Sequence, residues 1–74
     1  MKTPEISIII PCYNEEKALN AVLKKVCNSL ENNKISAEII VVDDASHDNT
    51  LQIAEQFVAD DRRFPIKIIS SNPN

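Results

Sequence analysis

Glycine and tryptophan are missing from this 74-residue sequence, and tyrosine occurs only once. Doubly wound α/β domains normally use glycine in their tight turns, because glycine adopts a positive backbone φ without steric cost. The absence of glycine also excludes the glycine-rich turn through which dinucleotide-binding folds hold a pyrophosphate at a helix N-terminus. If the fold is of the doubly wound type, the composition therefore indicates an incomplete unit.

Cysteine and long apolar runs are scarce as well. Cys12 and Cys27 lie among apolar residues without Cys-x-x-Cys or Cys/His spacing, which favours free thiols in a reducing cytosol over a zinc site or a disulfide framework. No stretch of about 18 apolar residues occurs. Pro11 and the polar residues 13–16 interrupt the first apolar run, so the N-terminus has no signal-peptide core. We therefore predict a cytoplasmic location.

Charge is modest and slightly acidic, with 8 basic and 11 acidic residues and a net charge of −3. Basic residues cluster no further than Lys24-Lys25 and Arg62-Arg63, so we predict no nucleic-acid partner. The second pair, next to Asp60-Asp61, is expected to be a solvated helix end, and His47 a solvated turn residue. A chain of this length has room for one small domain of marginal stability.

The distribution of apolar residues predicts alternating strands and helices. Strands are expected at residues 5–10, 37–42 and 66–69, and helices at residues 14–32 and from residue 46 to about 60–63. Proline cannot donate a hydrogen bond in a sheet, so Pro11 is expected to end the first strand. The expected helix caps are Asn14 and Ser46, and the acids expected in the first turns are Glu15, Glu16 and Asp48.

Each helix is expected to bury one apolar stripe against a sheet. The stripes comprise Leu19, Val22, Leu23, Val26 and Leu30 in the first helix, and Leu51, Ala54, Phe57 and Val58 in the second. The β-branched run at residues 39–42 suits a strand that is covered on both faces. Alternation of strands and helices implies a parallel sheet with right-handed crossovers, in which the middle strand lies beside the first. The predicted fold class is therefore α/β, with β-α-β-α-β order.

The candidate site lies at the carboxyl edge of this sheet, where open α/β folds bind ligands. Two loops meet there, the first at residues 12–16 after the first strand and the second at residues 43–48 after the second strand, so Tyr13 and Asp44 can face one crevice. An aromatic ring can stack on a base, and a nearby carboxylate can accept hydrogen bonds from a base N–H or ribose hydroxyls. The alternative is that Tyr13 packs over the sheet edge and that one aspartate caps the following helix. A diphosphate would need a bridging divalent cation, for which Asp43 and Asp44 alone are too few ligands.

Two segments resemble the N-terminal nucleotide-binding half of family 2 glycosyltransferases, which have the GT-A fold. They are Ser-Ile-Ile-Ile-Pro-Cys-Tyr-Asn-Glu-Glu at residues 7–16 and Glu-Ile-Ile-Val-Val-Asp-Asp-Ala-Ser-His-Asp-Asn-Thr at residues 38–50. The Tyr-Asn-Glu-Glu sequence is most similar to the polyprenyl-phosphate, or dolichol-phosphate, sugar transferases. The resemblance implies that residues 1–74 are the N-terminal part of a nucleotide-sugar-binding domain, a truncated Rossmann-like GT-A unit.

This resemblance also implies roles for individual residues. The nucleotide pocket would be lined by Pro11, Tyr13 and Glu15, with Tyr13 against the base. Asp44 would contact the base, and Asp43 would support the site. The donor would be a UDP- or GDP-linked sugar. The intact enzyme would need Mg²⁺ or Mn²⁺, and it could use a membrane or lipid acceptor.

The sequence departs from the family pattern at two places. Ala45 stands where the family usually has glycine, which restricts the turn. The chain stops at Asn74, which would match the asparagine that opens the family's next glycine-containing segment, before the Asp-x-Asp metal motif, the catalytic base and the acceptor region. Sugar transfer needs a cation at the leaving diphosphate and a base for the acceptor. We therefore expect this chain to bind a donor nucleotide and to be inactive alone.

Two other interpretations of the sequence stay open. One is a receiver-like domain in which an acidic pair binds magnesium, although receivers normally place that pair after the first strand and this chain places it after the second. The other is a non-catalytic interaction module that self-associates through an uncovered sheet edge.

Overall fold

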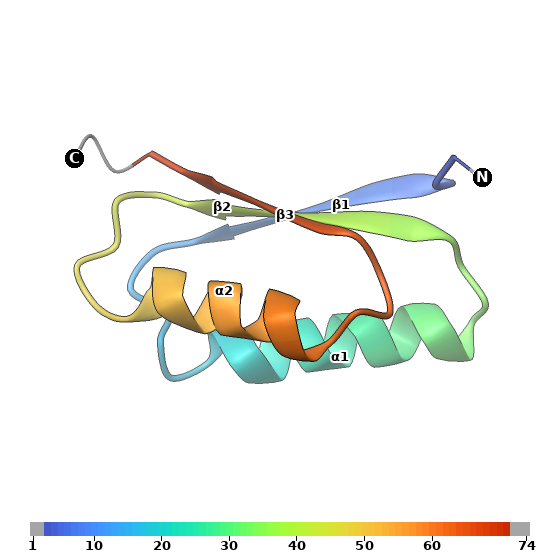
Figure 1. Ribbon diagram of the computed structural model, residues 1–74, viewed down its shortest axis with the longest axis horizontal. Helices are drawn as coiled ribbons and strands as arrows, with labels where there is room; N and C mark the ends of the chain where they lie inside the picture. The colour runs from blue at the N-terminus through green and yellow to red at the C-terminus, as the bar shows by residue number, and fades with distance from the viewer. Residues whose placement is uncertain (1–2, 72–74) are drawn as a thin grey trace.

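In the part of the chain that the structure describes, three parallel strands alternate with two helices (Figure 1). The computed structural model describes residues 3–71. The elements are β1 (Ile6–Cys12), α1 (Leu19–Asn32), β2 (Ala37–Asp43), α2 (Thr50–Asp60) and β3 (Ile66–Ser70). The predicted order is confirmed, and the expected match at Asn74 lies outside the described residues.

The strand order in the sheet is β1-β2-β3, and both pairs are parallel. Ile8 of β1 lies opposite Ile39 of β2, and Val41 of β2 lies opposite Ile68 of β3. The prediction that the middle strand lies beside the first is therefore confirmed. Because all three strands run the same way, the ends of β1 and β2 and the loops that leave them lie at one edge of the sheet.

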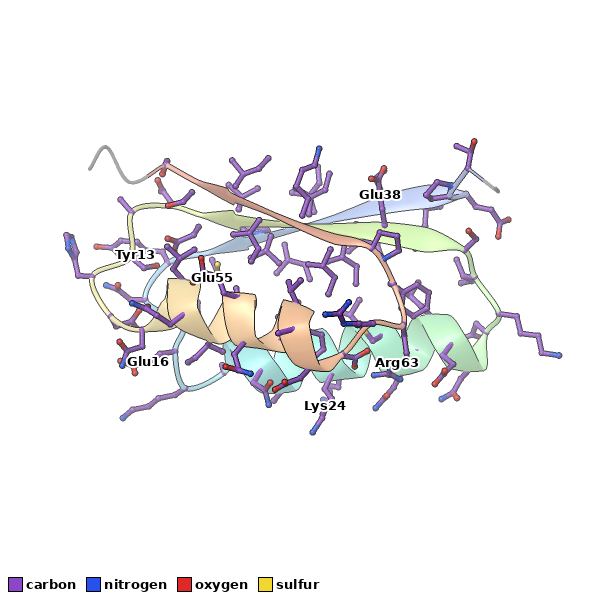
Figure 2. The ribbon with its side chains drawn as sticks, viewed as in Figure 1. Tyr13, Glu16, Lys24, Glu38, Glu55 and Arg63 are labelled. Carbon is purple, nitrogen blue, oxygen red and sulfur yellow. The ribbon has the colours of Figure 1, made fainter. Side chains whose placement is uncertain are left out.

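Both helices cover the same face of the sheet (Figure 1). Two right-handed crossovers that step in the same direction across a sheet place their helices on the same side. Alternate β2 residues are accordingly buried, from Ala37 to Asp43, whereas those between them are only half-buried. Figure 2 shows Glu38 on the side of the sheet away from the helices. The prediction that this strand is covered on both faces is wrong for the described chain.

The core lies between the sheet and the helices. On α1 the buried stripe is Leu19, Leu23, Cys27 and Leu30, and on α2 it is Thr50, Ala54 and Phe57. The stripe expected on α1 is partly wrong, since Val22 is 42% exposed and Cys27 takes a core position. Residues at i, i+4, i+8 and i+11 lie in one row on a helix, and Val22 lies beside that row. Both cysteines are free thiols, as predicted, and burial raises the pKa of each.

Pro11 lies inside β1, so the prediction that it ends the strand is wrong. The backbone N–H of Ile6 donates to Ser36 on the β2 side, and the carbonyl of Cys12 accepts from Asp44 on that side. Because backbone groups alternate along a strand, the nitrogen of Pro11 faces the other side, away from β2. Its missing N–H therefore removes no hydrogen bond between β1 and β2, which is how edge strands tolerate proline.

Among the described residues, three that are not glycine have a positive φ: Asn14, Lys34 and Ala45. Lys34 follows α1, and its N–H donates to the carbonyl of Glu31 while the N–H of Ile35 donates to that of Leu30. This pair of bonds is a Schellman motif, whose left-handed position is usually glycine. The chain therefore makes its left-handed turns without the residue best suited to them.

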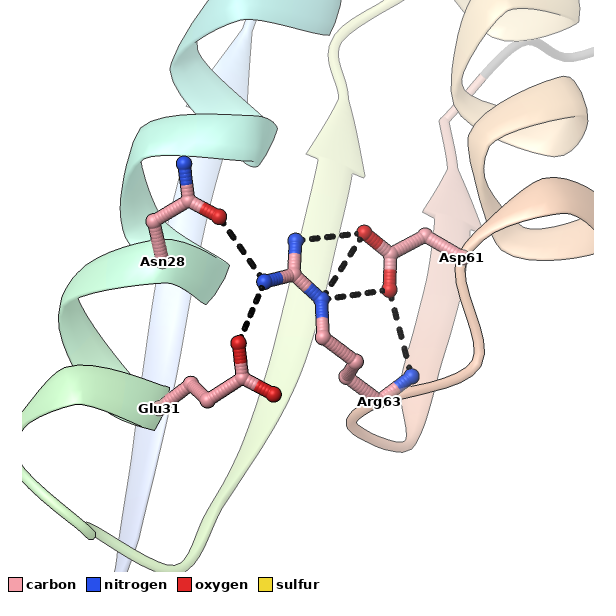
Figure 3. Close-up of polar contacts among 4 residues, drawn as sticks. All are labelled: Asn28, Glu31, Asp61 and Arg63. Carbon is pink, nitrogen blue, oxygen red and sulfur yellow. Dashed lines mark hydrogen bonds and ion pairs between the residues drawn. The ribbon is translucent and has the colours of Figure 1, made fainter.

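Arg63 joins the end of α1 to the segment after α2 (Figure 3). Its guanidinium forms ion pairs with Glu31 at 3.0 Å and with Asp61 at 2.7 Å, and it donates to Asn28 at 2.8 Å. The hydrogen bonds from Arg63 hold the pKa of Asp61 below its usual value. Arg63 is exposed, as expected for a solvated helix end, and the contacts with α1 are an addition that the sequence did not predict.

Candidate functional site

A hollow of about 450 Å³ opens at the carboxyl edge of the sheet. The residues that line it are Pro11, Cys12, Tyr13, Glu15, Val42, Asp44 and Ser71. Four of the five predicted site residues therefore lie around one space, although the strands that carry them are far apart in sequence. The fifth, Asp43, is 2% exposed and lies behind the hollow rather than in its wall.

Tyr13 is 52% exposed at the rim of the hollow. Its ring meets the ring of His47 edge to face, with centroids 6.5 Å apart and an interplanar angle of 81°. Figure 2 places Tyr13 at the end of the molecule where the loops after β1 and β2 lie. One face of a half-exposed aromatic ring next to a concave space is available for stacking on a planar ligand.

Asp44 is exposed and contributes the carboxylate at the wall. Its N–H donates to the carbonyl of Cys12 at 3.0 Å, which extends the contact between β1 and β2 by one residue. Its carboxylate accepts a hydrogen bond from the Ser71 hydroxyl at 3.1 Å. Since a carboxylate has about four acceptor positions, Asp44 can still accept hydrogen bonds from a ligand. It does not cap α2, which begins six residues later.

Three successive backbone N–H groups of the first loop donate to side chains of the second loop and of Thr50, the first residue of α2. The N–H of Asn14 donates to Ser46 Oγ at 2.9 Å, that of Glu15 to Thr50 Oγ1 at 2.8 Å, and that of Glu16 to Asp48 Oδ2 at 3.3 Å. The sequence Ser-x-Asp-x-Thr thus presents three acceptors to three donors. We call these three bonds the loop bridge.

The prediction that Asn14 and Ser46 cap the helices is wrong, because both residues take part in the loop bridge instead. Asn14 lies well before α1, whose N-cap is Ala18, and neither described helix has a side-chain cap hydrogen bond. Ser46 likewise lies outside α2, whose N-cap is Asn49. These polar residues resemble caps in sequence because the same oxygens that satisfy helix N–H groups can satisfy loop N–H groups. Local sequence does not distinguish the two uses.

Asp48 and Thr50 form the inner part of the loop bridge. The backbone N–H of Thr50 donates to Asp48 Oδ1 at 2.9 Å, and the Thr50 hydroxyl donates to the same oxygen. Burial raises the pKa of Asp48, but the hydrogen bonds from Thr50 and Glu16 outweigh it and leave the pKa below its ordinary value. Thr50 is fully buried, and the sequence analysis assigned it no role. The one feature that could have indicated its bonds to Asp48 is its position two residues after that aspartate.

Asp43 anchors the second loop from beneath. Its Oδ1 accepts a hydrogen bond from the Ser46 hydroxyl, and its Oδ2 accepts one from the Ser70 hydroxyl at 3.5 Å. Asp43 is also the last residue of β2, so its position is fixed by the sheet. Asp43 therefore connects the second loop to the end of β3 through these two bonds, and its part in a nucleotide site stays a prediction.

Ala45 has φ 54°, the left-handed conformation that favours glycine. Ala45→Gly is expected to raise the free energy of unfolding by about 0.5–1 kcal/mol, because relief of the left-handed strain exceeds the extra entropy of glycine in the unfolded chain. Urea denaturation at pH 7 measures the change. The matched control is Ala21→Gly on the exposed side of α1, which should lose about 1 kcal/mol. A lower free energy of unfolding in Ala45→Gly as well as in Ala21→Gly would contradict the expectation.

The residues of this site do not themselves form a metal centre. Within residues 3–71, no group of three or more His, Cys, Asp or Glu side chains could hold a metal ion. Asp43 is buried and accepts from two serines, which leaves Asp44 and Glu15 as the carboxylates at the hollow. This donor set does not fit the Mg²⁺ or Mn²⁺ expected for the intact enzyme. Likewise, no helix in the described part of the chain is long and apolar enough to cross a membrane.

The parallel β-α-β-α-β unit with two crossover helices is part of a Rossmann-like GT-A fold. A crystal structure of S. aureus TarS, residues 1–349, matches it with a TM-score of 0.71 and 31% identity, over 93% of this chain and 19% of that one. The sequence profile of glycosyl transferase family 2 matches residues 7–74. The chain belongs to glycosyl transferase family 2. This membership replaces the receiver-like interpretation.

Similar proteins are found in bacteria, in archaea and in the mouse. The chain is 44% identical over 62 residues to Protein RfbJ of Shigella flexneri, covering 84% of this chain and 45% of that protein. It is 36% identical over 64 residues to undecaprenyl-phosphate 4-deoxy-4-formamido-L-arabinose transferase of Pseudomonas fluorescens, covering 86% and 19%. It is 35% identical over 65 residues to dolichol-phosphate mannosyltransferase of Pyrococcus furiosus, covering 88% and 17%. The chain thus spans less than half the length of these relatives.

Proposed function

We propose that residues 1–74 form the N-terminal part of a nucleotide-sugar-binding domain, in a glycosyltransferase that transfers a sugar from a UDP- or GDP-linked donor. The observation that carries this proposal is the hollow, which brings the ring of Tyr13 and the carboxylate of Asp44 to one space from two strands. Its volume of about 450 Å³ is within the range of small-molecule sites.

Five of the seven lining residues are placed in this proposal. The base stacks on Tyr13, and Asp44 accepts hydrogen bonds from the base or ribose. Pro11 and Val42 supply apolar wall, and Glu15 lies at the rim. Asp43 contacts no ligand and holds the second loop in place. The segment is proposed to bind the nucleoside of the donor and to be inactive in sugar transfer alone.

The acceptor is proposed to be a polyprenyl phosphate at the cytoplasmic side of a membrane. Two similar proteins support this proposal through their names, an undecaprenyl-phosphate transferase and a dolichol-phosphate transferase. The acceptor-binding residues are not assigned to any residue of this chain.

Binding of UDP and GDP by isothermal titration calorimetry tests the proposal. Tyr13→Ala and Asp44→Asn are each expected to weaken binding about tenfold, because stacking on a base and a charge-assisted hydrogen bond are each worth roughly 1–3 kcal/mol. Asp60→Asn, at the exposed end of α2, is the matched control and should leave affinity unchanged. Unchanged affinity in both site variants, or no binding by the wild-type protein, would contradict the proposal.

The open face of the sheet favours a second candidate, an interaction module. Ile9 is 63% exposed and Ile69 is 48% exposed on strands at the two edges of the described sheet. Apolar side chains on an uncovered face favour association with another chain or a second copy. Sedimentation velocity over a range of concentrations distinguishes this candidate, since a monomer at every concentration counts against self-association.

A further inference from the structure

Asn14 is held to the second loop from both its backbone and its side chain. Its N–H donates to Ser46 Oγ at 2.9 Å, and its Oδ1 accepts from the N–H of His47 at 2.8 Å. Its φ of 51° lies in the left-handed region, which asparagine tolerates better than most residues. Two bonds from the neighbouring loop therefore fix an uncommon backbone conformation directly after Tyr13.

The Ser46 hydroxyl lies between the buried carboxylate of Asp43 and the exposed backbone of Asn14. It donates its proton to Asp43 Oδ1 and accepts the N–H of Asn14, so its one donor and an acceptor lone pair are both used. Asp43 is 2% exposed and belongs to β2, whereas Tyr13 is 52% exposed. A continuous chain of bonds thus runs from the sheet through Ser46 and Asn14 to the residue at the rim of the hollow.

The other two members of the loop bridge act further from Tyr13. Thr50 and Asp48 hold the N–H groups of Glu15 and Glu16, which lead into α1. Of the three, only Ser46 bonds to the backbone of Asn14, the residue after Tyr13; the neighbouring His47 donates to the Asn14 side chain and carries the ring that meets the Tyr13 ring. The contacts that hold Tyr13 and Asn14 in place therefore come from Ser46 and His47, and the one to the Asn14 backbone comes from Ser46.

We propose that Ser46 is a positioning residue, which fixes Tyr13 at the rim of the hollow through Asn14 and so sets the affinity of the site for a nucleoside diphosphate. The ligand in this proposal rests on the proposed function, whereas the restraint on Tyr13 does not. A hydroxyl at residue 46 is required because it must donate to a carboxylate and accept from a backbone N–H at once. Alanine can do neither, and threonine can do both.

Tyrosine fluorescence gives a direct readout, because the sequence contains one tyrosine and no tryptophan. Acrylamide quenching and steady-state anisotropy then report on Tyr13 alone. The variants are Ser46→Ala, Ser46→Thr and the matched control Ser7→Ala, which removes a hydroxyl bonded to Glu38 on the open sheet face. Far-UV circular dichroism shows whether each variant is folded, and calorimetry with UDP and GDP gives the affinity.

We expect Ser46→Ala to increase the quenching constant of Tyr13 about twofold, to lower its anisotropy, and to weaken nucleotide binding about tenfold, the equivalent of about 1.4 kcal/mol. Ser46→Thr and Ser7→Ala should stay within about twofold of wild type. Folded Ser46→Ala protein with wild-type quenching and anisotropy would overturn the proposal. If Tyr13 is released in this variant but the wild-type protein binds neither nucleotide, the positioning role stands and the proposed function fails.

Hydrogen exchange in the wild-type protein keeps the proposal testable if Ser46→Ala does not fold. The Asn14 N–H lies in an exposed loop, so only its bond to Ser46 slows exchange with solvent. Protection of at least about tenfold over an unstructured peptide is expected by NMR. Exchange of the Asn14 amide at the unprotected rate would overturn the proposal without any substitution.

Discussion

Leu23→Ala is expected to cost about 3 kcal/mol of the free energy of unfolding. Leu23 is completely buried on the row of α1 that faces the sheet, and truncation of a buried leucine loses transfer free energy and leaves a cavity. The total free energy of unfolding of a chain of this size is roughly 4–11 kcal/mol, at about 0.05–0.15 kcal/mol per residue. The variant therefore loses a large share of its stability, which urea denaturation followed by circular dichroism measures.

Val22→Ala is the matched control for that experiment. Val22 is the preceding residue of the same helix and is 42% exposed, so its truncation removes fewer contacts. A loss below about 1 kcal/mol is expected, as for surface substitutions in general. If the two variants were equally destabilised, the orientation of α1 against the sheet would be contradicted.

Thr50→Val is expected to cost about 2 kcal/mol, although it keeps the shape and β-branching of the side chain. The Thr50 hydroxyl is fully buried, accepts the N–H of Glu15 at 2.8 Å and donates to Asp48. Valine leaves that N–H without its acceptor, and an unsatisfied buried polar group costs about 1–3 kcal/mol. Urea denaturation gives the loss, and amide exchange at Glu15 should become faster in the same variant.

Thr3→Val serves as the matched control, because Thr3 is exposed and lies before β1. A change within about 0.5 kcal/mol is expected there. Equal stability of Thr50→Val and the wild-type protein would show that the inner part of the loop bridge does not support the fold.

The element order, the parallel sheet and the family could be predicted because they depend on information that is local or dense in the sequence. The spacing of apolar residues distinguishes the strand at residues 39–42 from the helix α1. The alternation of strands and helices then restricts the sheet topology to a few choices. The placing of Tyr13 and Asp44 at one hollow followed from topology alone, since parallel strands end at the same edge.

The errors concern partners that sequence does not specify. Pro11 was expected to end its strand, but whether a missing N–H matters depends on which side of the strand it faces. Ser46 was interpreted as a cap because its oxygen could serve a helix or a loop. The ion pair of Arg63 with Glu31 joins residues 32 positions apart, and no local sequence pattern predicts it.

The loop bridge has a consequence for synthesis and folding. Its acceptors lie 32–35 residues after their donors, so the first loop cannot take its final form until Thr50 has left the ribosome and β2 has joined β1. Contacts of long sequence separation form late, because the chain must first lose the entropy of closing the intervening loop. A nascent chain stalled within β2 would therefore carry a complete first loop sequence and no binding site.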